Sequence, residues 1–202
     1  MKRRLRVAIF LTSACVVLAA FSNVAQAQKV DLAFGLSTTD APGASSTSGN
    51  HQPVSLSGGA YTGISGDVQF LHNFGIGAEI NWRASQGEWG GYQPYRPIFY
   101  DVNAVYSPKL VDHVYLELQG GIGALSTRFY TQNQTCDFYT CTNYNSDNHF
   151  AEHVGGGLKF YPKGGFFVRP EAHLYIVNNN LYFSADRVFR YGLSIGYTFG
   201  QH

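Results

Sequence analysis

From residue 29 onward, apolar and polar residues alternate along the chain with a period of two, interrupted by short turns and by longer polar stretches. Such alternation places side chains on the two opposite faces of a β-strand. In the clearest segment, Ile76 and Ile80 share one face, whereas Glu79 and Arg83 share the other. The pattern predicts eight strands, at 30–37, 61–71, 76–85, 98–107, 114–126, 150–161, 166–176 and 187–199.

The charged residues within these segments indicate which face is inside. Ten of them fall on the polar face, among glycines and serines: Asp31, Asp67, Glu79, Arg83, Asp101, Glu117, Lys159, Arg169, Glu171 and Arg190. Glu152 is an exception near the start of its segment. Small residues and charges of both signs suit a narrow interior, so we expect the apolar face to point outward. That face carries aromatic residues near the segment ends, as the girdles of membrane barrels do: Trp82, Tyr100, Tyr106, Tyr191, Tyr197 and Phe199.

An eight-stranded barrel is just wide enough to be filled by its own side chains. Unpaired charges in that space would be costly, so the interior charges must pair with one another. We therefore predict a structural network and no large solute pore, with a narrow path for ions or water left open as an alternative. The predicted network comprises Glu79, Arg83, Asp101, Glu117, Lys159, Arg169, Glu171 and Arg190.

The connections between the segments alternate in length. Long ones occupy 38–60, 86–97, 127–149 and 177–186, and short ones occupy 72–75, 108–113 and 162–165. In membrane barrels the periplasmic turns are short and the extracellular loops are long. The strict alternation predicts an up-and-down barrel with both of its ends on the short-turn side.

The first 27 residues have the features of a secretory signal peptide. A basic start is followed by an apolar stretch and by small residues at Ala25 and Ala27. Cleavage would leave a single domain at 28–202, with ten basic and 13 acidic residues and a net charge of −3. A faintly acidic chain argues against nucleic-acid binding. No run after Ala27 approaches the roughly 18–20 apolar residues of a spanning helix.

Two cysteines, Cys136 and Cys141, stand close together in a predicted loop, whereas Cys15 falls in the signal peptide. Because an exported chain passes through an oxidising compartment, the pair is expected to form a disulfide. A metal site would need further ligands, for which His149 is the nearest candidate. We predict the disulfide, and neither a metal site nor a cofactor.

Over the whole chain beyond residue 27, the sequence resembles the small outer-membrane barrels of the OmpA and OmpX type. The last segment matches the terminal strand that the insertion machinery reads in this class, through Gly192, Ile195, Tyr197 and Phe199, although three residues follow Phe199. The resemblance implies an all-β, eight-stranded antiparallel transmembrane barrel in the bacterial outer membrane. The peptidoglycan-binding domain of OmpA has no counterpart here, so that function is not expected.

The favoured function is a structural or surface-interaction role without enzymatic activity. Expected partners are outer-membrane lipid, the insertion machinery, and a glycan or protein at the extracellular loops, and we expect a monomer. In the loop at 127–149, Phe129, Tyr130, Phe138, Tyr139 and Tyr144 could bind such a ligand or pack over the barrel mouth. The alternatives are a lipid A-modifying enzyme, in which His173 would be the base, and a soluble lipocalin-like barrel. His173 has Tyr175 where a serine nucleophile would stand.

Overall fold

The computed structural model describes residues 29–42, 55–136, 141–179 and 182–200. The predicted signal peptide lies outside these residues and stays a prediction. Within the described ranges, no helix is long and apolar enough to cross a membrane.

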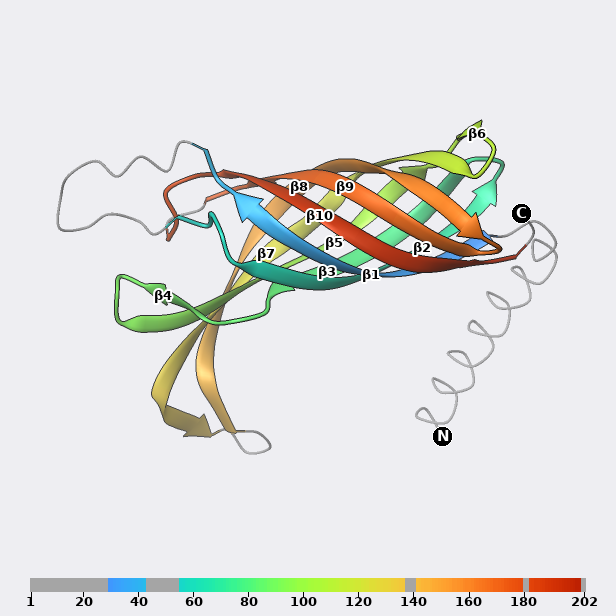
Figure 1. Ribbon diagram of the computed structural model, residues 1–202. Helices are drawn as coiled ribbons and strands as arrows, with labels where there is room; N and C mark the ends of the chain where they lie inside the picture. Colours follow the sequence, from blue (N-terminus) through green and yellow to red (C-terminus); the bar gives the residue numbers. More distant parts are fainter. Residues whose placement is uncertain (1–28, 43–54, 137–140, 180–181, 201–202) are drawn as a thin grey trace, which may run out of the picture.

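Eight long strands and two short ones make up one antiparallel sheet (Figure 1). The long strands are β1 (Lys29–Asp40), β2 (Ala60–Leu71), β3 (Phe74–Arg83), β5 (Gln93–Tyr106), β7 (Val114–Cys136), β8 (Cys141–Lys163), β9 (Phe166–Val177) and β10 (Arg187–Phe199). The short strands are β4 (Gly87–Trp89) and β6 (Lys109–Val111), which extend the connections on either side of β5. Since β1 pairs with β10, the eight long strands close into a ring. This confirms the predicted eight-stranded up-and-down barrel.

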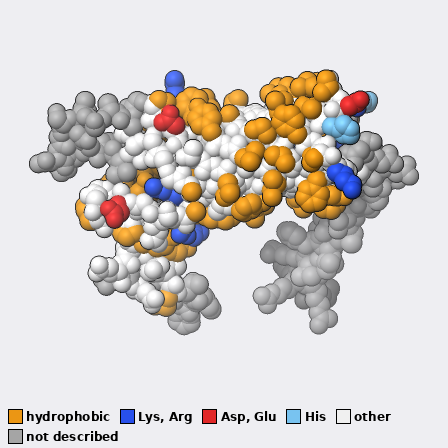
Figure 2. Space-filling view, in the orientation of Figure 1, with side chains coloured by type: hydrophobic (Ala, Val, Ile, Leu, Met, Phe, Trp, Pro, Cys, Tyr) orange, Lys and Arg blue, Asp and Glu red, His pale blue; other side chains and the backbone are white. Residues whose placement is uncertain are grey.

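The two faces of the strands differ as the alternation predicts. In β1, Asp31 and Ala33 are buried inside the ring, whereas Leu32 and Phe34 are half exposed on its outside. Figure 2 shows hydrophobic side chains over the barrel body, with most charged side chains towards its two ends. Water would make so much exposed apolar surface costly. The outer face is therefore the lipid-facing face of a transmembrane barrel.

The two ends of the barrel are named here by their connections. The long-loop end carries the connections β1–β2, β3–β5, β7–β8 and β9–β10, and lies to the left in Figure 1. The short-turn end carries β2–β3, β5–β7 and β8–β9, together with the start of β1 and the end of β10. In known barrels of this type the long loops are extracellular.

The predicted loops at 86–97 and 127–149 differ from the structure. Strand β5 begins at Gln93, β4 pairs with it, and β7 and β8 continue as a hairpin well past the barrel. The extended hairpin leaves the barrel wall towards the lower left of Figure 1 and diverges from the β4–β5 hairpin past the last β5–β7 pair, Tyr95 with Phe129. Both faces of a strand in water can be polar, so these strands lack the apolar alternation that marks the membrane-spanning parts.

The side chains inside the ring form three layers, which β9 displays in order. Phe167 belongs to an aromatic cluster at the short-turn end, with Ala33, Tyr161 and Tyr115. Arg169, Glu171 and His173 follow in the polar middle, and Tyr175 and Val177 join a larger apolar cluster at the long-loop end. The polar site therefore lies between two apolar layers.

Candidate functional site

The polar layer is organised around three cations, of which Lys159 is nearest the short-turn end. Its ammonium group forms ion pairs with Asp31 of β1 and Glu117 of β7, and lies 3.6 Å from Asp67 of β2. Lys159 is fully buried, and its Nζ also lies 5.3 Å from the centre of the Phe167 ring. One side chain of β8 thus links three other strands across the interior.

Arg169 of β9 is the second cation. Its Nε donates to Glu171 at 2.8 Å and to the Ser194 hydroxyl at 3.0 Å, and its Nη1 forms an ion pair with Glu117. Its Nη2 donates to the Ser65 hydroxyl at 3.0 Å. The planar guanidinium suits several carboxylate and hydroxyl partners in fixed directions.

Arg190 of β10 is the third cation. Its Nη2 forms an ion pair with Glu79 of β3 and lies 3.7 Å from Glu171. Glu79 also accepts a hydrogen bond from the side-chain amide of Asn81. These contacts connect strands on opposite sides of the ring, so the network holds the barrel together through its centre.

Two histidines continue the network towards the long-loop end. Asn103 donates its amide N–H to Asp101, so its oxygen accepts from Nδ1 of His153 at 2.7 Å. In a neutral His153, Nε2 then accepts from Nδ1 of His173 at 2.8 Å. The planes of the two imidazole rings are nearly parallel, 13° apart, so the rings meet edge to edge through this hydrogen bond. The Tyr175 ring is stacked with His153 at 4.6 Å between ring centres, and the Tyr175 hydroxyl donates to Asp101 at 3.2 Å.

Two signals in the sequence could have revealed more of this arrangement. A carboxylate followed two residues later by a side-chain amide recurs on four strands, and each amide donates to its carboxylate: Asp67 and Gln69, Glu79 and Asn81, Asp101 and Asn103, Glu117 and Gln119. The glycine run 155–157 leaves room for large neighbours. A Cβ on Gly155 would lie 2.3 Å from Nδ1 of His173, and one on Gly157 would lie 2.9 Å from Cγ of Arg169.

Seven of the eight predicted network residues meet in the polar layer, and Arg83 does not. Arg83 lies nearer the long-loop end, where its Nη1 donates to the Tyr95 hydroxyl at 3.1 Å and its guanidinium lies over the Tyr95 ring. The alternation of apolar and polar residues predicts on which face of the sheet a side chain lies, but it does not predict the position of that side chain along the barrel axis. At the height of Arg83 the interior is already aromatic.

The interior is closed at the long-loop end by packed apolar side chains. Among the buried members, the Phe99 ring contacts the rings of both Tyr61 and Tyr175. The rest of this plug is formed by Ala41, Leu56, Tyr95, Leu125, Ala151, Val177, Phe183 and Val188. Within the described residues, buried apolar side chains therefore pack on both sides of the polar layer. The absence of a large solute pore stays a prediction.

Two groups of carboxylates and histidine lie close enough to hold a metal ion: Asp31, Asp67 and Glu117, and Glu79, Glu171 and His173. In each group a cation of the protein already contacts the carboxylates. Lys159 contacts all three members of the first, and Arg190 contacts both glutamates of the second. A metal ion would compete with these buried ion pairs, so the donor set favours a structural network.

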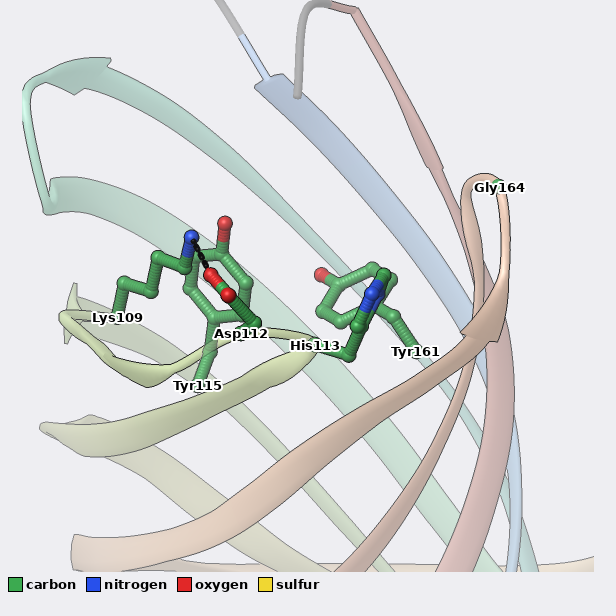
Figure 3. A pocket seen from close by; sticks show the side chains of 6 residues that line it. All are labelled: Lys109, Asp112, His113, Tyr115, Tyr161 and Gly164. Carbon is green, nitrogen blue, oxygen red and sulfur yellow. Dashed lines mark hydrogen bonds and ion pairs between the residues drawn. The ribbon is translucent and has the colours of Figure 1, made fainter.

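A pocket of about 270 Å³ lies at the short-turn end (Figure 3). Lys109 and Asp112 lie beside the ring of Tyr115, and His113 lies beside Tyr161 across the pocket. Lys109 Nζ donates to Asp112 at 2.7 Å. This contact raises the pKa of Lys109 and lowers the pKa of the Asp112 carboxyl from their ordinary values. Both side chains are exposed, so the pocket has a solvent-exposed ion pair at its rim.

A second pocket lies at the long-loop end, on the projecting sheet, the name used here for the parts of β4, β5, β7 and β8 that lie beyond the barrel. This groove has a volume of about 410 Å³ and is lined by uncharged residues: Tyr92, Gln93, Pro94, Tyr130, Thr131 and Gln132. They come from the β4–β5 hairpin and from β7. Gln93 Nε2 donates to the backbone oxygen of Tyr130 at 3.2 Å, which ties the two walls together.

The disulfide between Cys136 and Cys141 closes the end of the β7–β8 hairpin, as predicted. The two cysteines are cross-strand partners in the register of β7 and β8. Fixing this pair limits slippage of the two strands, whose polar faces specify register only weakly. The disulfide therefore stabilises the sheet that carries the groove.

The aromatic residues of the predicted loop have two different positions. Phe129 packs against the plug, whereas Tyr130 and Tyr144 lie on the other face of the hairpin, with ring centres 6.0 Å apart. Phe138 and Tyr139 lie outside the described residues. Tyr182, from the β9–β10 connection, contacts Phe129. A hydrogen bond to the Asp147 carboxylate raises the pKa of the Tyr182 hydroxyl.

Comparison with known proteins agrees with this geometry. No protein-family model matches the sequence, and no curated protein matches it either. Solved structures do match over most of the chain. Neisserial surface protein A has a TM-score of 0.58 at 8% identity, covering 85% of this chain and 97% of its own. The fold is that of a small outer-membrane β-barrel.

Two further barrels support that assignment of the fold. Ail, the attachment invasion locus protein of Yersinia pestis, has a TM-score of 0.53 at 15% identity, covering 86% of this chain and 99% of its own. A major outer-membrane protein of Thermus thermophilus has a TM-score of 0.54 at 10% identity, covering 86% and 100%. At these identities the likeness concerns the fold.

The remaining candidate residues also have defined places. Ile195, Tyr197 and Phe199 are exposed on the lipid-facing side of β10, and Gly192 lies where a Cβ would be 2.8 Å from Cβ of Ser37. His173 is buried in the polar layer. It is therefore separated from outer-leaflet lipid, on which a lipid-modifying base would have to act.

Proposed function

We propose that this protein is an integral outer-membrane barrel with a surface-interaction role, and that its binding surface is the groove on the projecting sheet. The observation that carries the proposal is that the β4–β5 and β7–β8 hairpins continue past the barrel, and that a groove lined by both lies just beyond the last β5–β7 pair, Tyr95 with Phe129. The sealed interior argues against solute transport as the main role. The proposed ligand is an uncharged glycan.

The chemistry of the groove supports a glycan. Tyr92 and Tyr130 offer aromatic faces, on which the apolar face of a sugar ring can pack. The exposed side-chain amide of Gln132 can donate and accept hydrogen bonds with sugar hydroxyls. Tyr92 is 76% exposed, so its ring is accessible to a ligand.

The Ail structure provides a useful contrast, because it was determined with the heparin analogue sucrose octasulfate. A polysulfated ligand requires cations, whereas the residues that line the groove here are uncharged. We therefore expect the groove residues themselves to bind a neutral oligosaccharide.

Binding of the folded full chain to an array of neutral and sulfated oligosaccharides tests the proposal. We expect retention of a neutral glycan, reduced at least about tenfold by Tyr92→Ala, the factor that corresponds to about 1.4 kcal/mol. Tyr191→Ala, an exposed tyrosine on the lipid-facing side of β10, is the matched control and should bind as the unchanged protein does. Absence of neutral-glycan binding by folded protein, or equal losses in both variants, would contradict it.

We also propose that β10 serves as the signal for the insertion machinery, through Gly192, Ile195, Tyr197 and Phe199. The outward position of the three larger side chains supports this role, since they stay accessible while the strand awaits pairing with β1. Phe199→Ala should slow assembly in cells without changing the stability of the folded barrel by more than about 1 kcal/mol. Unchanged assembly kinetics would contradict the role. A monomeric state remains our expectation.

A further inference from the structure

Two arginines lie directly opposite one another on the outer face of the sheet. Arg96 of β5 and Arg128 of β7 are cross-strand partners, and both are partly exposed. Like charges at directly opposite positions of a sheet destabilise the pair of strands. Within the described part of the chain, neither arginine has an ion pair with a carboxylate. Among the described residues, the two positive charges thus have no carboxylate partner.

The contacts of the two guanidinium groups leave most of their N–H donors unused. Arg128 lies 4.7 Å from the ring centre of Tyr144, and Arg96 lies 5.9 Å from that of Tyr130. Ring stacking occupies the flat face of a guanidinium and leaves its edges free to donate. Arg96 makes one long hydrogen bond, from Nη2 to the backbone oxygen of Ala84 at 3.4 Å, and its buried Nε has no partner.

The position of the pair relates it to the membrane. On the outer face of β5, Arg96 is followed by Ile98, Tyr100 and Val102, and the last two are 42% and 62% exposed. At about 3.3 Å per residue, Arg96 lies roughly 13 Å along the strand from Tyr100. The arginines therefore lie at the long-loop end, just beyond the apolar belt that the exposed outer-face side chains such as Tyr100 and Val102 form. This is the depth of the head groups in the outer leaflet, given the hydrocarbon thickness of a bilayer.

We infer that Arg96 and Arg128 together bind a phosphate group of a lipid head group in the surrounding outer leaflet. A phosphate between the two guanidinium groups accepts charge-assisted hydrogen bonds from both and removes their mutual repulsion. Lys or Arg side chains are visible where the projecting sheet meets the barrel body (Figure 2). The apolar belt below the pair identifies the source of the phosphate as lipid, because a free anion has no need of that location.

This site is separate from the glycan groove in its chemistry, although Tyr130 contributes to both. It rests on the proposed position of the barrel in the outer membrane. A folded barrel that binds lipid without regard to phosphate would leave that position intact and overturn the site. A chain that shows no heat-modifiable migration after refolding in detergent, and needs no detergent to stay soluble, would instead overturn the membrane position itself.

Native mass spectrometry of the full chain in neutral detergent micelles tests the inference. Three probes are compared: lipid A with its phosphates, the same glycolipid with the phosphates removed, and inorganic phosphate. We expect phosphorylated lipid A to be retained at least about tenfold more than the dephosphorylated form. The double variant Arg96→Gln/Arg128→Gln should lose this preference and keep the heat-modifiable migration of a folded barrel.

Arg187→Gln is the matched control, because Arg187 is an exposed arginine on the outer face of β10 and pairs with the uncharged Ile176. It should retain the preference for the phosphorylated lipid. Equal retention of both lipids by the unchanged protein would overturn the inference, as would equal losses in the double variant and in Arg187→Gln. If inorganic phosphate displaced the lipid completely at a concentration equal to that of the lipid, the two arginines would form a site for free anions, and the inference would be overturned.

Discussion

The cations inside the barrel and the cations on its outer rim have opposite environments. Lys159, Arg169 and Arg190 are buried, and each contacts carboxylates from at least two strands. Arg96 and Arg128 are partly exposed, contact tyrosine rings, and face one another. Buried cations that link strands through carboxylates stabilise the fold, whereas rim cations without a carboxylate partner can bind ligands.

The largest expected effect comes from removing an inner cation. Arg169→Met leaves Glu117 and Glu171 with one fewer partner in a sealed interior, and breaking such a buried pair costs about 3–5 kcal/mol. Urea unfolding of the barrel in lipid vesicles measures the loss. Arg128→Met is the control and should change the free energy of unfolding by less than about 1 kcal/mol in neutral lipid. Similar losses in both would abolish the distinction between inner and outer cations.

Phe99 and Tyr100 are adjacent residues of β5 whose side chains lie on opposite faces of the strand. Phe99→Ala opens a cavity in the plug and should cost about 3 kcal/mol, since Phe99 is fully buried against Tyr61 and Tyr175. Tyr100→Ala, on the lipid-facing side, creates no cavity and should cost clearly less. Ion conductance across a planar bilayer should rise only in Phe99→Ala. An equal rise in both variants would place the seal elsewhere.

A smaller effect is expected from the disulfide. The ring closed by Cys136 and Cys141 is short, so its loss should lower the stability of the β7–β8 hairpin by about 2 kcal/mol and leave the barrel itself unchanged. In the double variant Cys136→Ser/Cys141→Ser, protease cleavage within the hairpin should increase while the heat-modifiable gel migration is retained. Loss of that migration would show that the hairpin supports the barrel.

The smallest effect concerns the exposed pair of Lys109 and Asp112, which has the chemistry of the inner pairs without their burial. The pKa of Asp112 is lowered, so its contribution is full above about pH 4 and is lost as pH falls through the folded-state pKa. The pKa of Lys109 is raised, so its contribution is lost as pH rises through that pKa above about 10.4. An NMR titration of the Asp112 carboxyl should show a lowered pKa that returns towards the ordinary value in high salt. A pKa insensitive to salt would contradict an exposed pair.

The sequence predicts the barrel well because two different environments act on the two faces of each spanning strand. Asp31 and Leu32 must lie on opposite faces, whichever strands pair with β1. It predicts the projecting sheet poorly because water accepts either face of a strand there. Arg128 and Phe129 belong to β7, yet the sequence pattern predicts them as loop residues.

The candidate site could be predicted only in part for a related reason. Alternation places His153 and His173 inside, but their contact depends on the register of β8 and β9, which places Gly155 opposite His173. The same limitation applies to Arg83, whose face is predicted correctly and whose height is not. The arginine pair on the rim requires the register of β5 and β7, because Arg96 and Arg128 are far apart in the sequence.

One set of unfolding measurements can separate inner cations that hold the fold together from rim cations that bind outside partners. The free energy of unfolding is compared for the unchanged protein, Arg169→Met and Arg96→Gln/Arg128→Gln, in neutral bilayers and in bilayers that contain phosphorylated lipid A. We expect Arg169→Met to lose the same free energy of unfolding in both bilayers. The rim variant should lose only the additional stability that phosphorylated lipid A gives the unchanged protein. A rim variant destabilised as much as Arg169→Met in neutral lipid, or stabilised by phosphorylated lipid as fully as the unchanged protein, would contradict this distinction between inner and rim cations.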